Sequence, residues 1–66
     1  MYDYVRDHYS FKPVIGRRVM HDETRKEGVI TPEDRSQGHY VQVRFDGSNF
    51  SLPCHPGSLV YVDAAP

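Results

Sequence analysis

The stretch "HYVQVRFDGSNFSL" (residues 39–52) carries the strongest strand and turn signals of the chain. Apolar and polar side chains alternate in its first half, which predicts a strand with Val41, Val43 and Phe45 on one face. The dipeptide Asp46-Gly47 follows, and it is typical of a two-residue type I′ turn, in which both central residues need positive φ. The sequence therefore predicts a β-hairpin whose second strand returns over the rest of the stretch.

The predicted turn also fixes the register of the hairpin. Val43 is expected to face Phe50, so that the apolar residues of both strands gather on one face. Continued along the ladder, the same register places Cys54, the only cysteine of the chain, opposite His39 on the inward side.

The opposite face of the hairpin is expected to point outward and to be polar. An exposed aromatic ring beside a guanidinium and amide groups can stack a base or hold a peptide. The residues of this predicted binding face are Tyr40, Gln42, Arg44 and Asn49.

Further strands are predicted at residues 17–21, 28–31 and 59–62, with polar loops at 22–27 and 32–38. The turn "HPGS" (residues 55–58) is too rich in Pro and Gly for a strand and predicts a tight turn or 3₁₀ step. We therefore predict a mainly β fold: a five-stranded SH3-like barrel, in which a bent sheet closes on itself and protects its edges.

A short α-helix is predicted before the barrel, over residues 2–9. Tyr2, Val5 and Tyr9 are spaced as on one helix face, and Pro13 ends the segment. A helix this short needs a docking surface, so we expect one domain in which residues 1–13 dock on a barrel of residues 14–66. Its many aromatic residues leave open a monomer or a weak homodimer through this helix.

Three short motifs resemble a known group of folds. They are "GRRVMHDETRKEGVI", with Val19, Lys26, Gly28 and Ile30, then "YVQVRFDG" and "HPGSLVYV". Together they resemble the KOW and Tudor-type branch of SH3-like barrels over roughly residues 16–63. The loop at 22–27 has no glycine, unlike the KOW pattern. The stretch "GHYVQVRFDG" with "PCHPGSL" also resembles uncharacterised small proteins of bacteriophages and prophages.

Composition limits what this chain can do. Its 66 residues allow one domain and no deep substrate cavity, and a net charge of −1 excludes a global positive field for nucleic acid. One cysteine excludes an internal disulfide and fits a reducing cytoplasm. No apolar run has the length of a signal peptide core or a membrane span, so we expect a cytoplasmic protein without membrane contacts.

Histidine and cysteine side chains raise the alternatives of catalysis and metal binding. Cys54 and His55 are neighbours and point to opposite faces of a strand, so a thiolate activated by histidine would require His39 instead. No oxyanion donor or third orienting group is indicated. The four residues that could bind zinc lack the usual ligand spacing, and they are His21, His39, Cys54 and His55. We expect no catalytic residues, no metal and no cofactor.

The expected function is that of a non-enzymatic binding module. A protein partner, from a host or a phage, is expected on the outward face and on the loops at 22–27 and 32–38. The alternative is a KOW-like nucleic-acid binder that contacts phosphate through its basic residues, although nearby acidic residues offset their charge. These basic residues are Arg17, Arg18, Arg25, Lys26 and Arg35.

Overall fold

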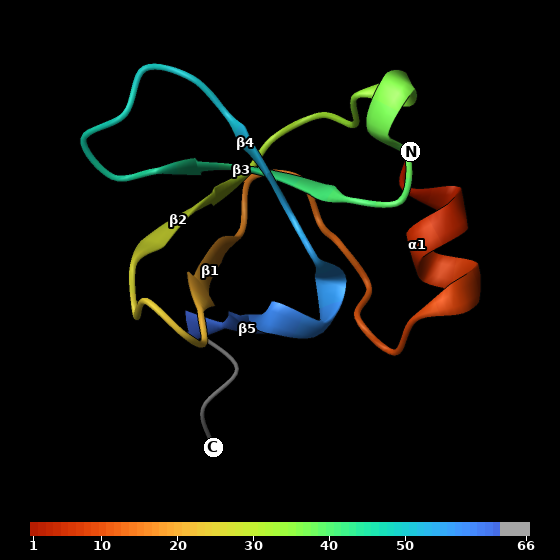
Figure 1. The fold of residues 1–66 in the computed structure, drawn as a ribbon, viewed down its shortest axis with the longest axis horizontal. Coiled ribbons are helices and arrows are strands. Elements are labelled where there is room, and N and C mark those ends of the chain that lie inside the picture. Colours follow the sequence, from red (N-terminus) through yellow and green to blue (C-terminus); the bar gives the residue numbers. More distant parts are fainter. Residues whose placement is uncertain (63–66) are drawn as a thin grey trace.

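Five short antiparallel strands and one short α-helix make up the protein in a computed structural model, which describes residues 1–62 (Figure 1). The elements are α1 (Asp3–His8), β1 (Arg18–His21), β2 (Glu27–Ile30), the 3₁₀ turn η1 (Arg35–Gln37), β3 (Val41–Phe45), β4 (Leu52–Cys54), the 3₁₀ turn η2 (Pro56–Ser58) and β5 (Leu59–Tyr61). The predictions of a mainly β fold, a short N-terminal helix and a 3₁₀ step before the last strand are confirmed. Within residues 1–62, no helix has the length and apolarity needed to cross a membrane.

The strands form one sheet in the order β4-β3-β2-β1-β5, so β4 and β5 are its two edges. Only residues 55–58 connect these edges, and three of the four form η2. A flat sheet of five strands would separate its edges by about 19 Å, more than a four-residue 3₁₀ connection can span. The sheet is therefore strongly bent, as Figure 1 shows, but the strand pairing does not close it.

The register between β3 and β4 differs from the predicted one by two residues. Val43 faces Leu52 instead of Phe50, and the connection is a loop of residues 46–51. The predicted type I′ turn is wrong because Gly47 has positive φ (85°) and Asp46 does not. Phe50 consequently lies in the loop with 66% of its surface exposed.

The core lies on the concave face of the sheet. A shift of two residues leaves each side chain on its predicted face, so the prediction that Val41 and Val43 point inward is confirmed. The buried apolar residues are Tyr2, Val5, Val19, Ile30, Val41, Val43, Cys54 and Leu59.

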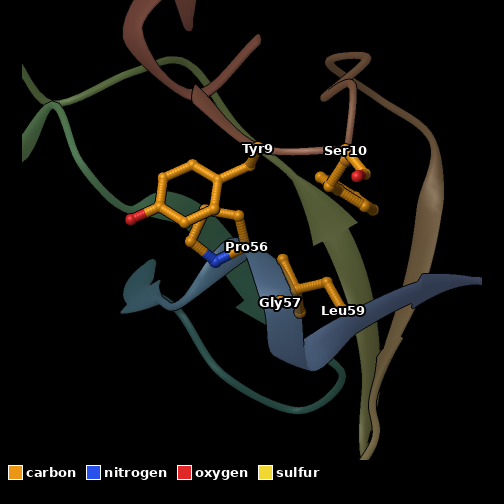
Figure 2. A pocket seen from close by; sticks show the side chains of 6 residues that line it. Tyr9, Ser10, Pro56, Gly57 and Leu59 are labelled. Carbon is orange, nitrogen blue, oxygen red and sulfur yellow. The ribbon is translucent and has the colours of Figure 1, made fainter. Parts of the chain in front are cut away.

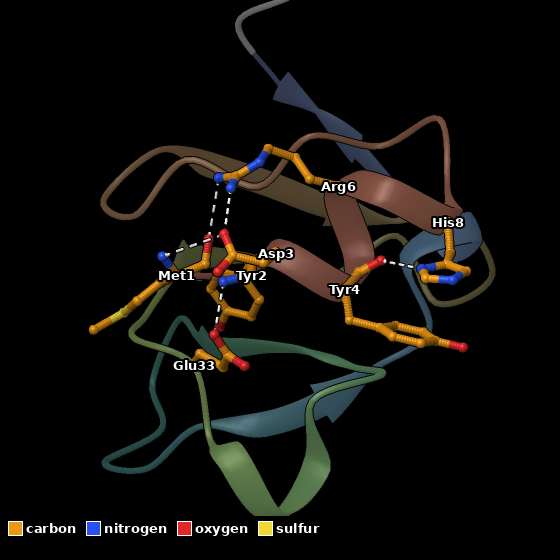
Figure 3. A network of polar contacts seen from close by, with 7 residues as sticks. All are labelled: Met1, Tyr2, Asp3, Tyr4, Arg6, His8 and Glu33. Carbon is orange, nitrogen blue, oxygen red and sulfur yellow. Dashed lines mark hydrogen bonds and ion pairs between the residues drawn. The ribbon is translucent and has the colours of Figure 1, made fainter.

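The N-terminal segment is part of this core. Val5 on α1 is fully buried, and Tyr2 is buried in a left-handed backbone conformation (φ 59°) that is rare for a residue with a bulky side chain. Tyr2 donates its backbone N–H to Glu33 Oε1 at 2.6 Å, next to η1 (Figure 3). Asp3 forms an ion pair with Arg6 on the exposed side of α1, shown in the same view. The buried contacts of Tyr2 and Val5 fix α1 on the sheet.

Candidate binding surface

Three of the four residues of the predicted outward face are exposed, and they are Tyr40, Arg44 and Asn49. Gln42 is an exception, with only 5% of its surface exposed. The prediction that Gln42 projects from the face with the others is therefore wrong. What remains is a discontinuous set of polar residues instead of one strip along β3.

Gln42 is buried because η1 covers its side chain. The side-chain Nε2 donates to Gln37 Oε1 of η1 at 3.2 Å, and the backbone N–H donates to the Tyr2 hydroxyl at 3.0 Å. Strand alternation alone assigns Gln42 to the solvent side, but η1 lies over that side at this end of the sheet.

The two arginines at the start of β1 are already engaged within the protein. The Arg17 guanidinium lies 3.8 Å from the centre of the Tyr61 ring. Arg18 Nη2 contacts Asp46 Oδ2 at 2.5 Å and Glu27 Oε1 at 3.4 Å. The hydrogen bond with Asp46 is the main reason that the pKa of Arg18 is raised above its ordinary value. Because their guanidinium groups already make contacts within the protein, Arg17 and Arg18 can bind phosphate less readily than the sequence alone indicates.

The other basic residues of the prediction are exposed: Arg25 and Lys26 on a loop, and Arg35 at the start of η1. Arg25 and Lys26 belong to the turn between β1 and β2. This turn is closed by two backbone hydrogen bonds, from Arg25 N–H to the His21 carbonyl at 2.8 Å and from His21 N–H to the Lys26 carbonyl at 2.9 Å. Arg25 has positive φ (63°), a conformation that usually selects glycine.

An open groove lies between this turn, residues 22–26, and the loop of residues 46–51. We call it the turn–loop groove. Its volume is about 560 Å³, and Phe45 and Leu52 form the apolar part of its lining. Leu52 is 45% exposed although its neighbours on β3 are buried. The sequence does not predict this groove, because the predicted register places Leu52 in a paired strand interior.

Polar residues line the two sides of the turn–loop groove. His21 comes from the end of β1 and Thr24 and Lys26 come from the β1–β2 turn, while Asp46 and Ser48 come from the opposite loop. The groove thus combines a half-exposed aliphatic side chain and an aromatic ring with charged and hydroxyl groups at its edge. This combination is typical of sites that hold a short segment of another molecule.

A second cleft, of about 450 Å³, lies between residues 9–11 and η2 (Figure 2). Tyr9 and Pro56 lie side by side in it, and no charged side chain lines it. Residues next to the cleft connect the two segments, since the Tyr9 ring meets His55 edge-on and Phe11 stacks on Tyr61. The second cleft is therefore an apolar seam where the N-terminal segment packs on η2 and β5.

The structure does not bring Cys54 and His39 together. Cys54 faces Val41 across the ladder, and the His39 ring stacks on Tyr4 at 4.0 Å. The Cys54 thiol is buried, and this burial raises its pKa above the ordinary value, which disfavours the reactive thiolate. His55 has another role, because its Nδ1 accepts the Gly57 N–H at the start of η2.

The four possible zinc ligands are not assembled either. Among residues 1–62, the only set of three possible ligand residues whose side-chain atoms lie within 4.8 Å of one another is His21, Asp22 and Glu23. These are three consecutive residues of one exposed turn, and His21 Nδ1 already accepts the Glu23 N–H at 3.2 Å. The other three predicted zinc ligands, His39, Cys54 and His55, are not in this set.

Comparisons with protein-family models, with curated proteins and with solved structures find no match for this chain.

Proposed function

We propose that this chain is a non-enzymatic binding module that holds a segment of a partner protein in the turn–loop groove. The observation that carries the proposal is the exposure of Leu52 beside Phe45 in an open groove with polar edges. An aliphatic side chain with nearly half of its surface in water gains free energy when a partner covers it. The hydroxyl and charged groups at the edge supply directional contacts that select the partner.

The proposal includes an SH3-like small barrel as the scaffold. Its support is the strand order, in which β4 and β5 form opposite edges of a bent sheet and η2 connects them. A bent sheet of this kind gives a rigid base for the two connections that border the groove. A phage or prophage origin and a cytoplasmic location are further predictions. The buried free thiol of Cys54 is compatible with a reducing compartment.

The contacts that the arginines make within the protein favour a protein partner over nucleic acid. Arg18 is shared between two carboxylates and Arg17 lies over an aromatic ring. Nucleic-acid affinity depends on cations that can neutralise several phosphates at once. The KOW-like alternative would have to use other exposed cations, among them Arg25 and Lys26 on the β1–β2 turn, Arg35 on η1 and Arg44 on β3.

The surroundings of Cys54 support a function without catalysis. Nucleophilic catalysis needs a base within hydrogen-bonding distance of the thiol. The polar contact of the Cys54 Sγ is the carbonyl oxygen of Leu52 at 3.7 Å, which accepts a proton in a hydrogen bond and does not remove it.

The proposal is tested by selecting binders from a displayed library of random peptides. Selected peptides are expected to bind the wild-type protein and to lose affinity for Leu52→Ser. Val60→Ser is the matched control, because Val60 is an aliphatic residue of the edge strand β5 with the same exposure, 46% against 45%, and it lies outside the groove. This control should retain full affinity.

Two results would contradict the proposed function. One is the selection of peptides that bind Leu52→Ser as tightly as the wild type. The other is a failure to select any peptide. Binding of single-stranded oligonucleotides with an affinity that falls steeply as salt rises would then favour the nucleic-acid alternative.

A further inference from the structure

We infer that the turn–loop groove recognises an acidic peptide segment, in which a bulky apolar side chain stands next to a side-chain carboxylate. This inference rests on the proposed function and names the class of ligand. It follows from how the charges around the groove are compensated within the protein.

The acidic side of the groove is already neutralised. Asp46 lines the groove on the loop side and Glu27 lines it from β2. Both carboxylates contact the same Arg18 guanidinium, at 2.5 and 3.4 Å. A basic ligand residue would have to compete with Arg18 for these two carboxylates, and it would gain little from doing so.

The positive charge on the basic side of the groove is not compensated by an ion pair of this kind. Lys26 lines the groove and forms no ion pair with any other residue of the described range 1–62. Arg25 precedes it in the same turn and is likewise exposed and outside those ion pairs. Complementary charge on a partner steers its approach and fixes its orientation. A carboxylate at this edge of the groove therefore meets Lys26 without breaking an existing contact, and Arg25, which is outside the lining, adds a second positive charge on the same turn.

His21 adds a hydrogen-bond donor on the same side. Its Nδ1 accepts the backbone N–H of Glu23, so the neutral ring carries its proton on Nε2. Asp22 Oδ1 lies 3.9 Å from this Nδ1, and neither Asp22 nor Glu23 lines the groove. The groove side of the turn therefore offers donors and positive charge, while its two carboxylates lie outside the lining.

The backbone of Arg25 gives an independent reason to assign it a role. The left-handed conformation is unfavourable for arginine and is accepted freely by glycine. An arginine at this position lowers stability and places a cation beside the groove. Strained residues of this kind concentrate at binding sites, where function compensates for the lost stability.

Phe45 and Leu52 indicate which kind of apolar side chain the ligand carries. Phe45 is half-buried against the core, and Leu52 projects into the groove lining beside it. A bulky aliphatic or aromatic ligand side chain covers both. A carboxylate on a neighbouring ligand residue then reaches the turn that carries Lys26.

The inference is tested with the peptides selected from the random library. Their sequences are expected to be enriched in Asp or Glu next to a bulky apolar residue. Synthetic versions are acetylated and amidated, so that only side chains carry charge. Replacing the acidic residue by Gln should weaken binding to the wild-type protein roughly two- to fivefold, the effect of one exposed ion pair, and Lys should weaken it further.

Protein variants locate the carboxylate. In Lys26→Gln the ratio of affinities for the acidic peptide and its Gln counterpart should fall toward one, because the peptide carboxylate then faces a neutral side chain at the groove edge and only Arg25 keeps a positive charge on the turn. Arg25→Gly should show a smaller ratio than the wild type together with an equal or higher melting temperature, a combination that a purely structural role for Arg25 would not produce. Arg35→Gln, an exposed cation on η1, is the control and should leave the ratio unchanged.

Three results would overturn the inference, and they differ in their meaning for the proposed function. If the selected peptides bind in the groove without enrichment in acidic residues, or if Lys26→Gln keeps the wild-type affinity ratio, the acidic specificity is wrong and the proposed function stands. If no peptide is selected, both fail.

Discussion

The hydroxyl of Tyr2 is inserted into the ladder between β2 and β3, where it accepts the backbone N–H of Gln42 at 3.0 Å. It also donates to the Thr31 carbonyl at 2.6 Å. Thr31 N–H still donates to the Gln42 carbonyl at 2.9 Å, so one bond of this pair is direct and the other passes through the phenol. The second residue of the chain therefore completes the sheet.

Tyr2→Phe should lower the free energy of unfolding by about 1–3 kcal/mol, because it leaves a buried N–H of Gln42 without a partner. The measurement is urea denaturation followed by circular dichroism. Tyr40→Phe removes a hydroxyl from an exposed ring and should change stability by less than about 0.5 kcal/mol. Equal effects of the two substitutions would show that the Tyr2 hydroxyl does not support the ladder.

Alkaline pH should destabilise the protein through the same residue. Desolvation by burial raises the pKa of Tyr2 above its ordinary value, and the charge of Glu33 raises it further against the lowering effect of the Gln42 hydrogen bond. The folded state thus favours the neutral phenol. This contribution to stability is complete below the ordinary tyrosine pKa and is lost as pH rises through the raised value.

The ultraviolet absorbance of phenolate checks this expectation. Tyr2 should give an ionisation step above the ordinary tyrosine range in the folded protein, and this late step should disappear in Tyr2→Phe. If all tyrosines of the wild type titrate together while the protein remains folded, the burial of Tyr2 is wrong.

The Cys54 thiol should react slowly with a thiol reagent at neutral pH. The reacting species is the thiolate, and burial both raises the pKa of Cys54 and blocks access to it. The rate should increase strongly in urea as the protein unfolds. A reaction in native buffer as fast as that of the unfolded chain would indicate an accessible, activated cysteine and would revive the catalytic alternative.

Gly28→Ala should destabilise the sheet severely. A Cβ at position 28 would lie 2.4 Å from the Arg44 carbonyl oxygen and 2.7 Å from the Phe45 Cα, both of them backbone atoms that cannot move aside cheaply. Overpacking of this kind costs about 1–3 kcal/mol or more. Gly38→Ala is the control, because its nearest contact, Glu33 Oε2 at 3.6 Å, is ordinary and its φ of −63° suits alanine. Equal melting temperatures of the two variants would contradict the close approach of β2 and β3.

Most of the fold could be predicted from short-range patterns. Alternation identifies β3, and Pro56 with Gly57 marks η2, because these signals depend on neighbouring residues only. The faces of β4 were also predictable despite a wrong register. A shift of two residues preserves the side-chain alternation, so Cys54 stays inward with Val41 as its partner instead of His39.

The loop after β3 could not be predicted in the same way. Asp46-Gly47 is a strong turn signal, but the Ser48 hydroxyl accepts the Phe50 N–H at 3.3 Å and donates to the Phe50 carbonyl at 3.0 Å, which holds the chain in a longer loop. This loop forms one wall of the turn–loop groove, so the groove was missed together with the loop.

The burial of Gln42 was missed for a different reason. It depends on Gln37 of η1, whose side chain accepts a hydrogen bond from Gln42 Nε2. Local alternation carries no information about which segment covers a strand from outside. Binding faces inferred from alternation alone are subject to this error wherever a connecting segment folds over the outer face of the sheet.

The central claim is that the turn–loop groove holds the partner, and amide chemical-shift mapping with a selected peptide tests it most directly. We expect the largest shifts at residues that line the groove, with Lys26, Phe45, Asp46 and Leu52 among them. Little change is expected at Tyr9, Phe11 and Gly57 in the second cleft. Shifts concentrated in that cleft or around Tyr40, with the groove unaffected, would contradict the claim.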